Sequence, residues 1–168
     1  MKELSPYELD FNVFNKFGKE WALIVCNNDT LDNAMTISWG QMGILWSRPT
    51  ATVYVGNTRF TKPILDNINY FSISFFSKEY HDKLAYCGTV SRKDEDKISK
   101  CNFTRLYDEN NTLYLKDAEI TFIVKKIYQS DLPILEDTDP TIKKHYQPNE
   151  YHTQYICQIE KVIIKEKE

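Results

Sequence analysis

The chain has 168 residues, a formal net charge of −3 and 14% aromatic residues, with acidic and basic side chains interspersed along it. This length predicts one domain over residues 1–168, able to bury roughly 70% of its unfolded surface. The mixed charges argue against a nucleic-acid partner, which needs a concentrated basic face. The acidic N-terminus argues against a signal peptide, and no apolar run approaches the ~18 residues of a membrane span. We therefore expect a cytoplasmic protein without a membrane partner.

Apolar runs and alternating patterns predict a mainly β protein. The expected strands cover residues 21–26, 34–38, 51–56, 70–76, 119–129 and 154–164. The clearest is 70–76, where Phe71, Ile73 and Phe75 alternate with serines. A closed barrel would remove the edges that such a sheet otherwise exposes.

Three short helices are predicted between the strands. "TKPILDNI" (61–68) places Pro63 in the first turn, where its missing N–H does no harm. The second helix, 77–87, has Ser77 as its expected N-cap, and the third, 94–101, has Asp94.

Residues 130–152 contain three prolines and no clear period. A structureless connection of this length inside a domain is uncommon and tends to be functional. We expect either an active-site lid or an arm that embraces a second subunit.

A cluster of basic and hydroxyl side chains, "NTRFTKP" (57–63), precedes the first helix. Arg59, Thr61 and Lys62 suit phosphate oxygens, because they combine a two-pronged donor, a hydroxyl and a point charge at a helix start. "GTVSRKDEDK" (88–97) repeats this logic more weakly, with Ser91, Arg92, Lys93 and Lys97 around the start of another short helix. The alternatives are a capped helix with solvated basic residues and a charged surface turn.

The stretch "NAMTISWGQMGILWSRP" (33–49) combines hydrogen-bonding and aromatic side chains, as a flat and partly polar ligand would require. The polar set is Asn33, Thr36 and Ser38, and the apolar set is Met35, Trp39, Met42 and Trp46. Gly40 and Gly43 would let backbone approach a ligand closely. Together with the loop at 57–63, this favours a nucleotide-type cofactor with an isoalloxazine ring. The alternative is a hairpin whose aromatics fill the core.

The three histidines, His81, His145 and His152, show no metal-ligand spacing. We expect no metal site. His152 is either a structural histidine or a proton donor near a ligand.

The blocks "NAMTISWGQMGILWSRPTATVYV", "TRFTKPILDN", "FSISFF" and "CGTVSRKDEDK", in this order, resemble the flavin reductase-like family of FMN-binding split barrels, which includes flavoredoxin-type proteins. The resemblance covers residues 10–165. It implies a six-stranded split β-barrel with short inserted helices, usually a homodimer with FMN bound noncovalently near the subunit interface.

Carried onto this sequence, the resemblance implies one residue set for each part of FMN. Asn33, Ala34, Met35, Thr36, Ser38 and Trp39 would line the isoalloxazine and the ribityl chain, and Arg59, Thr61 and Lys62 would hold the phosphate. Ser91 and Lys97 would be further contacts, with a route across the dimer left open. The chain departs from the family at Gly56, where an arginine is frequent, and at Phe60, where a tyrosine is frequent.

The leading functional hypothesis is a flavoprotein oxidoreductase in which NADH or NADPH passes a hydride to flavin N5, as in flavin reductases. The flavin supplies the chemistry, so no catalytic residue is named. We expect the Thr36 hydroxyl and the backbone N–H groups of residues 35–38 to bond the ring. Two alternatives remain: a flavoredoxin-like electron-transfer protein reduced by a redox protein partner, and a flavin-binding module without turnover.

Overall fold

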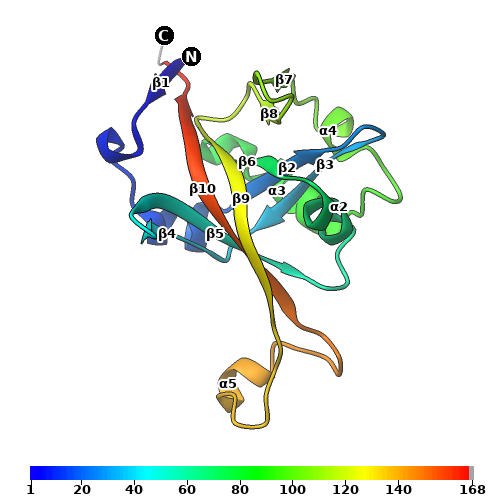
Figure 1. The fold of residues 1–168 in the computed structure, drawn as a ribbon. Coiled ribbons are helices and arrows are strands. Elements are labelled where there is room, and N and C mark those ends of the chain that lie inside the picture. The colour runs from blue at the N-terminus through cyan, green and yellow to red at the C-terminus, as the bar shows by residue number, and fades with distance from the viewer. Residues whose placement is uncertain (167–168) are drawn as a thin grey trace.

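The computed structural model describes residues 1–166, and its main element is an antiparallel sheet of eight strands that curves around a core (Figure 1). The strands are β1 (Lys2–Leu4), β2 (Ala22–Asn27), β3 (Asp32–Ile37), β4 (Gly40–Leu45), β5 (Arg48–Gly56), β6 (Tyr70–Phe75), β9 (Ile120–Leu132) and β10 (His152–Ile164). Their order is β3-β2-β6-β9-β10-β5-β4, with β1 on the far end of β10. No pairing joins β3 to β4 in the described part of the chain, so the barrel is split. The mainly β prediction and all six expected strands are confirmed.

Short helices fill the connections between strands. They are η1 (Pro6–Glu8), α1 (Val13–Asn15), η2 (Lys16–Glu20), α2 (Thr61–Asn67), η3 (Lys78–Tyr80), α3 (His81–Thr89), α4 (Lys97–Lys100) and α5 (Pro140–Lys143). Strands β7 (Arg105–Tyr107) and β8 (Leu113–Leu115) form a separate pair. Over residues 1–166, every helix is too short or too polar to cross a membrane.

Two predicted helix caps differ from the observed ones. Ser77 stands at the start of η3, but its hydroxyl donates to the Glu79 carboxylate and caps no backbone N–H. Asp94 lies in a turn closed by its N–H to the Ser91 carbonyl, so Asp96 caps α4 by accepting from the Ser99 N–H. Residues 94–96 are all acidic, and the turn places the last of them at the start of the helix.

Strand β4 is an element that the sequence analysis did not predict. It joins β5 through a two-residue turn in which Trp46 and Ser47 both have positive φ angles, 51° and 58°. A two-residue hairpin turn of this kind is normally signalled by Asn-Gly or Asp-Gly. Trp-Ser gives no such signal, because bulky residues rarely adopt left-handed backbone angles.

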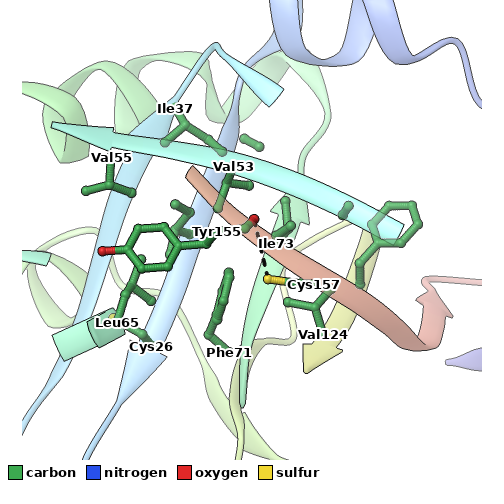
Figure 2. Packing of buried hydrophobic residues seen from close by; sticks show 14 of the residues in the cluster. Cys26, Ile37, Val53, Val55, Leu65, Phe71, Ile73, Val124, Tyr155 and Cys157 are labelled. Atoms are coloured by element: carbon green, nitrogen blue, oxygen red, sulfur yellow. Dashed lines mark hydrogen bonds between the residues drawn. The ribbon is translucent and has the colours of Figure 1, made fainter. Parts of the chain in front are cut away.

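The core has two clusters, one inside the barrel and one between the sheet and the helices α3 and α4. Strand β2 serves both: Ala22, Ile24 and Cys26 face the barrel interior, while Leu23 and Val25 face the second cluster. Burial on both faces explains why residues 21–26 read as a continuous apolar run. Figure 2 shows the barrel cluster around Phe71, Val53 and Tyr155.

Strands β9 and β10 stay paired beyond the end of β6 as a long ribbon, with β5 on the other side of β10, and this ribbon carries α5 near its tip (Figure 1). The prediction of a structureless segment at 130–152 is therefore wrong at both ends, since β9 runs to Leu132 and β10 begins at His152. We call residues 130–152 the arm.

Gly40 packs against the core and not against a ligand. A Cβ built on it would lie 2.4 Å from two atoms of the Phe17 ring, which is buried and packs edge-on against Phe75. At Gly43 nothing lies within 4 Å of such a Cβ. The expected ligand approach at Gly40 is wrong, because the Phe17 ring fills that space.

We predict that Gly40→Ala lowers the free energy of unfolding by about 1–3 kcal/mol, because the added methyl overpacks the Phe17 ring. Gly43→Ala is the matched control on the same strand and should stay within about 0.5 kcal/mol of the wild type. Urea unfolding measures both. Equal stability of the two variants would contradict the packing role of Gly40.

Candidate functional site

Two adjoining cavities lie where β3, β5, the arm and the α3–α4 region meet. The first, which we call the aromatic cavity, has a volume of about 370 Å³ and is lined by Met35, Thr36, Ile37, Ser38, Trp39, Tyr54, Gly56, Asn57, Thr58, Arg59, His145, Tyr146, Glu150, Tyr151 and His152. The second, the basic cavity, measures about 130 Å³ and is lined by Asn33, Met35, Thr58, Arg59, Phe60, Thr61, Cys87, Gly88, Thr89, Val90, Ser91, Arg92 and Lys97. Met35, Thr58 and Arg59 line both cavities, so the two are adjacent.

Aromatic rings from distant parts of the chain form the walls of the aromatic cavity. Trp39 follows β3 and keeps 45% of its surface exposed. Its ring centroid lies 4.9 Å from that of His152, the first residue of β10, and Tyr146 meets His152 edge-on at 5.3 Å. The arm therefore forms one wall of the cavity in the same chain. A flat ring could pack here, since aromatic faces and edges pair at these separations.

His152 is a polar residue of this cavity, and the sequence did not decide between a structural role and a role near a ligand. Its Nδ1 is buried and has no hydrogen-bond partner in the described structure. Burial lowers the pKa of His152, the positive charge of Arg59 lowers it further, and Glu150 opposes the shift. The side chain is thus neutral at neutral pH, with one nitrogen available to a ligand. This arrangement does not fit the alternative of a fully satisfied structural histidine.

The basic cavity holds positive charges that lack carboxylate partners. Lys97 is only 3% exposed, and its ammonium donates to the Cys87 carbonyl at 2.9 Å. Within residues 1–166 neither Lys97 nor Arg59 forms an ion pair. Burial lowers the pKa of Lys97, and Arg59 adds to this effect. A buried ammonium without an acidic partner is costly, so an anion in this cavity would relieve the cost.

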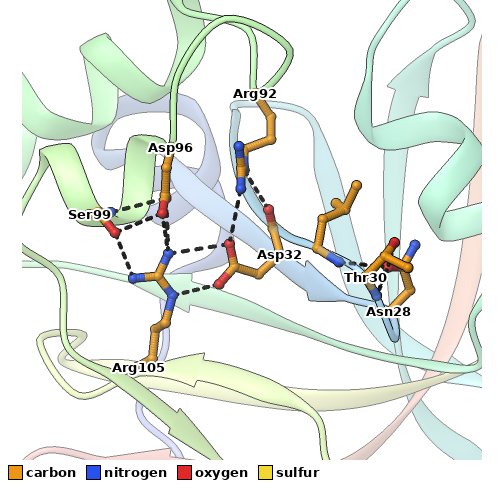
Figure 3. A network of polar contacts seen from close by, with 8 residues as sticks. Asn28, Thr30, Asp32, Arg92, Asp96, Ser99 and Arg105 are labelled. Atoms are coloured by element: carbon orange, nitrogen blue, oxygen red, sulfur yellow. Dashed lines mark hydrogen bonds and ion pairs between the residues drawn. The ribbon is translucent and has the colours of Figure 1, made fainter.

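A network of charges around Asp32, at the start of β3, positions the α4 region (Figure 3). Arg105 bridges the carboxylates of Asp32 and Asp96, and Asp96 caps α4, whose first residue is Lys97. Arg92 donates from Nε to the Asp32 carbonyl at 2.8 Å. The network thereby fixes the backbone from which Lys97 and Arg92 reach the basic cavity.

Most of the predicted cofactor residues line one of the two cavities. Asn33, Arg59, Thr61, Ser91 and Lys97 meet at the basic cavity, Thr36, Ser38 and Trp39 line the aromatic cavity, and Met35 lines both. Ser91 and Lys97 come from the same chain as Arg59, so the basic cavity forms without a second subunit.

Two predicted residues lie elsewhere, and two hydroxyls are already engaged. Ala34 is fully buried in the second core cluster. Lys62 pairs with Asp66 at 2.8 Å, one helical turn away, and lines neither cavity. The Thr36 hydroxyl donates to the Leu84 carbonyl, and the Thr61 hydroxyl donates to the Met35 sulfur while accepting from the Asn33 amide. The expected bond from Thr36 to the ring is therefore not supported.

An unpartnered acceptor remains beside Thr61. Asn33 is 1% exposed and gives its amide nitrogen to Thr61 at 2.8 Å, whereas its Oδ1 is buried without a partner among the described residues. Because buried polar groups are normally bonded, this oxygen marks a place where a ligand hydroxyl would fit.

The flanking apolar residues of the 33–49 stretch do not line either cavity. Met42 packs against the barrel core, and Trp46 is exposed at the β4–β5 turn, near Tyr128. The sequence analysis missed Tyr54, Tyr146 and Tyr151. Of these three, only Tyr54 could have been predicted, from its outward position on β5. Tyr146 and Tyr151 reach the cavity because they lie in the arm.

Comparison with known proteins places these cavities on a familiar architecture. No protein-family model matches the sequence, and no curated protein matches it significantly. Among solved structures, flavoredoxin from Methanosarcina acetivorans is similar with a TM-score of 0.71 and 18% identity, over 88% of this chain and 69% of that one. An FMN-binding protein from Thermus thermophilus has a TM-score of 0.69 and 16% identity, over 99% of this chain and 83% of that one.

Flavoredoxin of Desulfovibrio vulgaris (Miyazaki F) is also similar, with a TM-score of 0.69 and 21% identity over 99% of this chain and 78% of that one. At these identities the likeness is one of fold, and it confirms the architecture expected from the sequence resemblance. The chain has the fold of the flavin reductase-like FMN-binding barrels.

Proposed function

We propose that this protein is an FMN-binding oxidoreductase that holds the isoalloxazine in the aromatic cavity and the phosphate in the basic cavity. The observation that carries the proposal is the buried Lys97 ammonium, without a carboxylate partner, in a cavity that it lines with Arg59 and that adjoins a cavity walled by aromatic rings. The printed names of the structural neighbours, flavoredoxin and FMN-binding protein, support the same ligand. The four free, buried cysteines fit a reducing compartment such as the cytoplasm.

The residues present fit each part of FMN. Arg59 and Lys97 offer donors and positive charge for the phosphate. Asn33 lines the basic cavity, and its unpartnered Oδ1 can accept from a ribityl hydroxyl. Trp39 and His152 offer ring contacts and one free ring nitrogen for the isoalloxazine. Strand β3 ends the sheet, so alternate backbone N–H groups along it face away from β2 and would serve as donors to the polar rim of the ring.

When bound, FMN would supply hydride chemistry at its N5, with NADH or NADPH as the reductant. The protein's own contribution is positional and electrostatic. Arg59 and Lys97 would neutralise the phosphate, and Trp39 and the arm would exclude water from one side of the ring. Neutral His152 can hold a hydrogen bond at the ring edge without adding charge. No side chain is assigned a proton transfer, because hydride transfer between two rings requires none.

A flavoredoxin-like electron carrier, reduced by a redox protein partner, would use the same cavities, and so would a flavin-binding module without turnover. Reduction of the bound flavin by a nicotinamide nucleotide distinguishes the oxidoreductase from the electron carrier and from the flavin-binding module. The purified protein should retain flavin absorbance after incubation with FMN and desalting. Anaerobic NADH or NADPH should then bleach it without another protein. Retained flavin that neither nucleotide bleaches would leave the carrier or the module, and a colourless protein would overturn flavin binding.

We predict that Arg59→Ala raises the Kd for FMN by about 10- to 100-fold, because it removes charge-assisted bonds to the phosphate. Lys93→Ala is the matched control: this lysine is exposed in the neighbouring turn and lines neither cavity. Its effect should stay within about twofold, as expected for a screened surface charge. Equal losses in a flavin titration would count against the phosphate assignment.

We also propose that the protein is a homodimer and that the arm contributes to the interface. Large apolar side chains are exposed along the β4–β5 hairpin, the end of β9 and the arm: Ile44, Leu45, Trp46, Tyr128, Leu132, Leu135 and Ile142. Such a concentration of exposed apolar surface is typical of an interface. Light scattering after gel filtration should give twice the mass of one chain, and Trp46→Glu should shift the protein toward monomer. A monomeric wild type at micromolar concentration would refute the dimer.

A further inference from the structure

Beyond the paired strands, the arm is attached to the barrel by one residue, Asn57, which directly follows β5. The Asn57 N–H donates to the Tyr151 carbonyl at 2.9 Å, and the side chain bonds the arm twice more. Its Nδ2 donates to the Asn149 carbonyl at 3.0 Å, and its Oδ1 accepts from the Tyr151 N–H at 3.2 Å. Within residues 1–166, every hydrogen bond from residues 133–151 to a residue outside the arm ends on Asn57, and residues 133–151 form no ion pair. The position of the arm therefore depends on this residue.

The Asn57 amide bonds the arm in the way that a neighbouring strand would. A side-chain amide carries an acceptor and a donor on one planar group. It reaches the carbonyl of Asn149 and the N–H of Tyr151, two groups that lie on the same edge of an extended segment. The bond to the Tyr151 carbonyl meanwhile extends the pairing of Gly56 with His152 by one residue. Asn57 thereby fixes the chain over the last three residues before β10 begins.

We propose that Asn57 is a positioning residue for the flavin ring, which it serves by holding the arm in place as a wall of the aromatic cavity. The inference rests on the proposed function, because it takes this cavity as the site of the ring. The wall carries Tyr146, which meets His152 edge-on at 5.3 Å, and His145, whose ring centroid lies 6.0 Å from that of Trp39. Release of the arm from Asn57 would free His145 and Tyr146 to move away, and the ring would lose these contacts.

Burial contributes little to holding this part of the arm. Of residues 144–149, all except Tyr146 are exposed to solvent. The hydrogen bonds of Asn57 therefore decide how often the wall is in place. A ligand whose site is formed only part of the time binds more weakly, in proportion to the fraction of molecules in which the site is formed.

Asn27 offers a matched control, because its amide makes the same pair of bonds away from the flavin site. It is the last residue of β2, its Nδ2 donates to the Asn111 carbonyl at 3.0 Å, and its Oδ1 accepts from the Leu113 N–H at 2.9 Å. The two residues that offer carbonyls, Asn111 and Asn149, also share positive φ angles, 58° and 66°. Asn27 lines neither the aromatic nor the basic cavity. Alanine at either position removes equivalent bonds, but only one pair of bonds holds the arm.

The test measures the arm and the flavin separately in the wild type and in the variants Asn57→Ala and Asn27→Ala. In flavin-free protein, hydrogen–deuterium exchange should rise about tenfold over residues 144–152 in Asn57→Ala and stay unchanged over residues 70–76 of the barrel. Equilibrium dialysis should show that the Kd values for FMN and for riboflavin rise by the same factor, about tenfold, because both ligands carry the ring. Asn27→Ala should leave both Kd values within about twofold of the wild type. Arg59→Ala should raise only the Kd for FMN, because riboflavin has no phosphate.

Four results would overturn the proposal while FMN binding by the wild type stands. Unchanged exchange over residues 144–152 would show that Asn57 does not hold the arm, and raised exchange with unchanged Kd values would show that the arm does not shape the ring site. A loss for FMN alone would place the effect of Asn57 at the phosphate. Equal losses in Asn57→Ala and Asn27→Ala would assign the effect to general stability. Failure of the wild type to bind either flavin would instead overturn the proposed function, and the positioning role with it.

Discussion

The antiparallel pairing of β9 with β10 is the constraint on which both the barrel and the site depend. Strand β10 lies between β9 and β5, and its buried residues Thr153, Tyr155, Cys157 and Ile159 alternate with less buried ones. A slip by one residue would turn this whole set away from the core, so packing at the barrel end fixes the register of the ribbon. That register also determines where β10 begins, which places His152 opposite Gly56 and against Trp39. Core packing thus sets the geometry of the aromatic cavity.

The basic cavity depends on a different balance. Burial of the Lys97 charge costs free energy, and the bonds that fix the start of α4 keep the residue in place. Desolvation opposes the Lys97 ammonium, and the Cys87 carbonyl offsets only part of that cost. The lysine cannot swing out to solvent freely, because the Asp96 cap and the Arg105 bridge fix the start of α4. Functional sites often contain an energetically unfavourable group that the bonds of neighbouring residues hold in place. This balance distinguishes Lys97 from Lys62, which has an acidic partner and needs no ligand.

The sequence was informative wherever function or burial follows a local pattern, and uninformative where it depends on distant contacts. Alternation in 70–76 and the apolar run at 21–26 predicted their strands, because sheet faces repeat every second residue. Arg59 and Lys97 were predicted separately from two basic loops, yet only the fold shows that both loops face one cavity. Conversely, no pattern distinguished Lys62 from its neighbours, nor showed that the Phe17 ring would occupy the space at Gly40. The arm residues Tyr146 and Tyr151 reach the site through a ribbon whose length is set by pairing, which composition does not reveal.

Gly56 links the departure from the resembling family to the shape of this site. A Cβ at Gly56 would stand 3.6 Å from Arg59 and 3.7 Å from His152, so a long side chain would extend into the aromatic cavity. Where relatives are expected to place a cation on β5, this chain keeps an open cavity and carries its unpaired charges on the α2 and α4 side, in Arg59 and Lys97. The phosphate of a bound flavin would therefore depend on Arg59 and Lys97, and the loss of either charge would not be compensated by a cation at position 56 of β5.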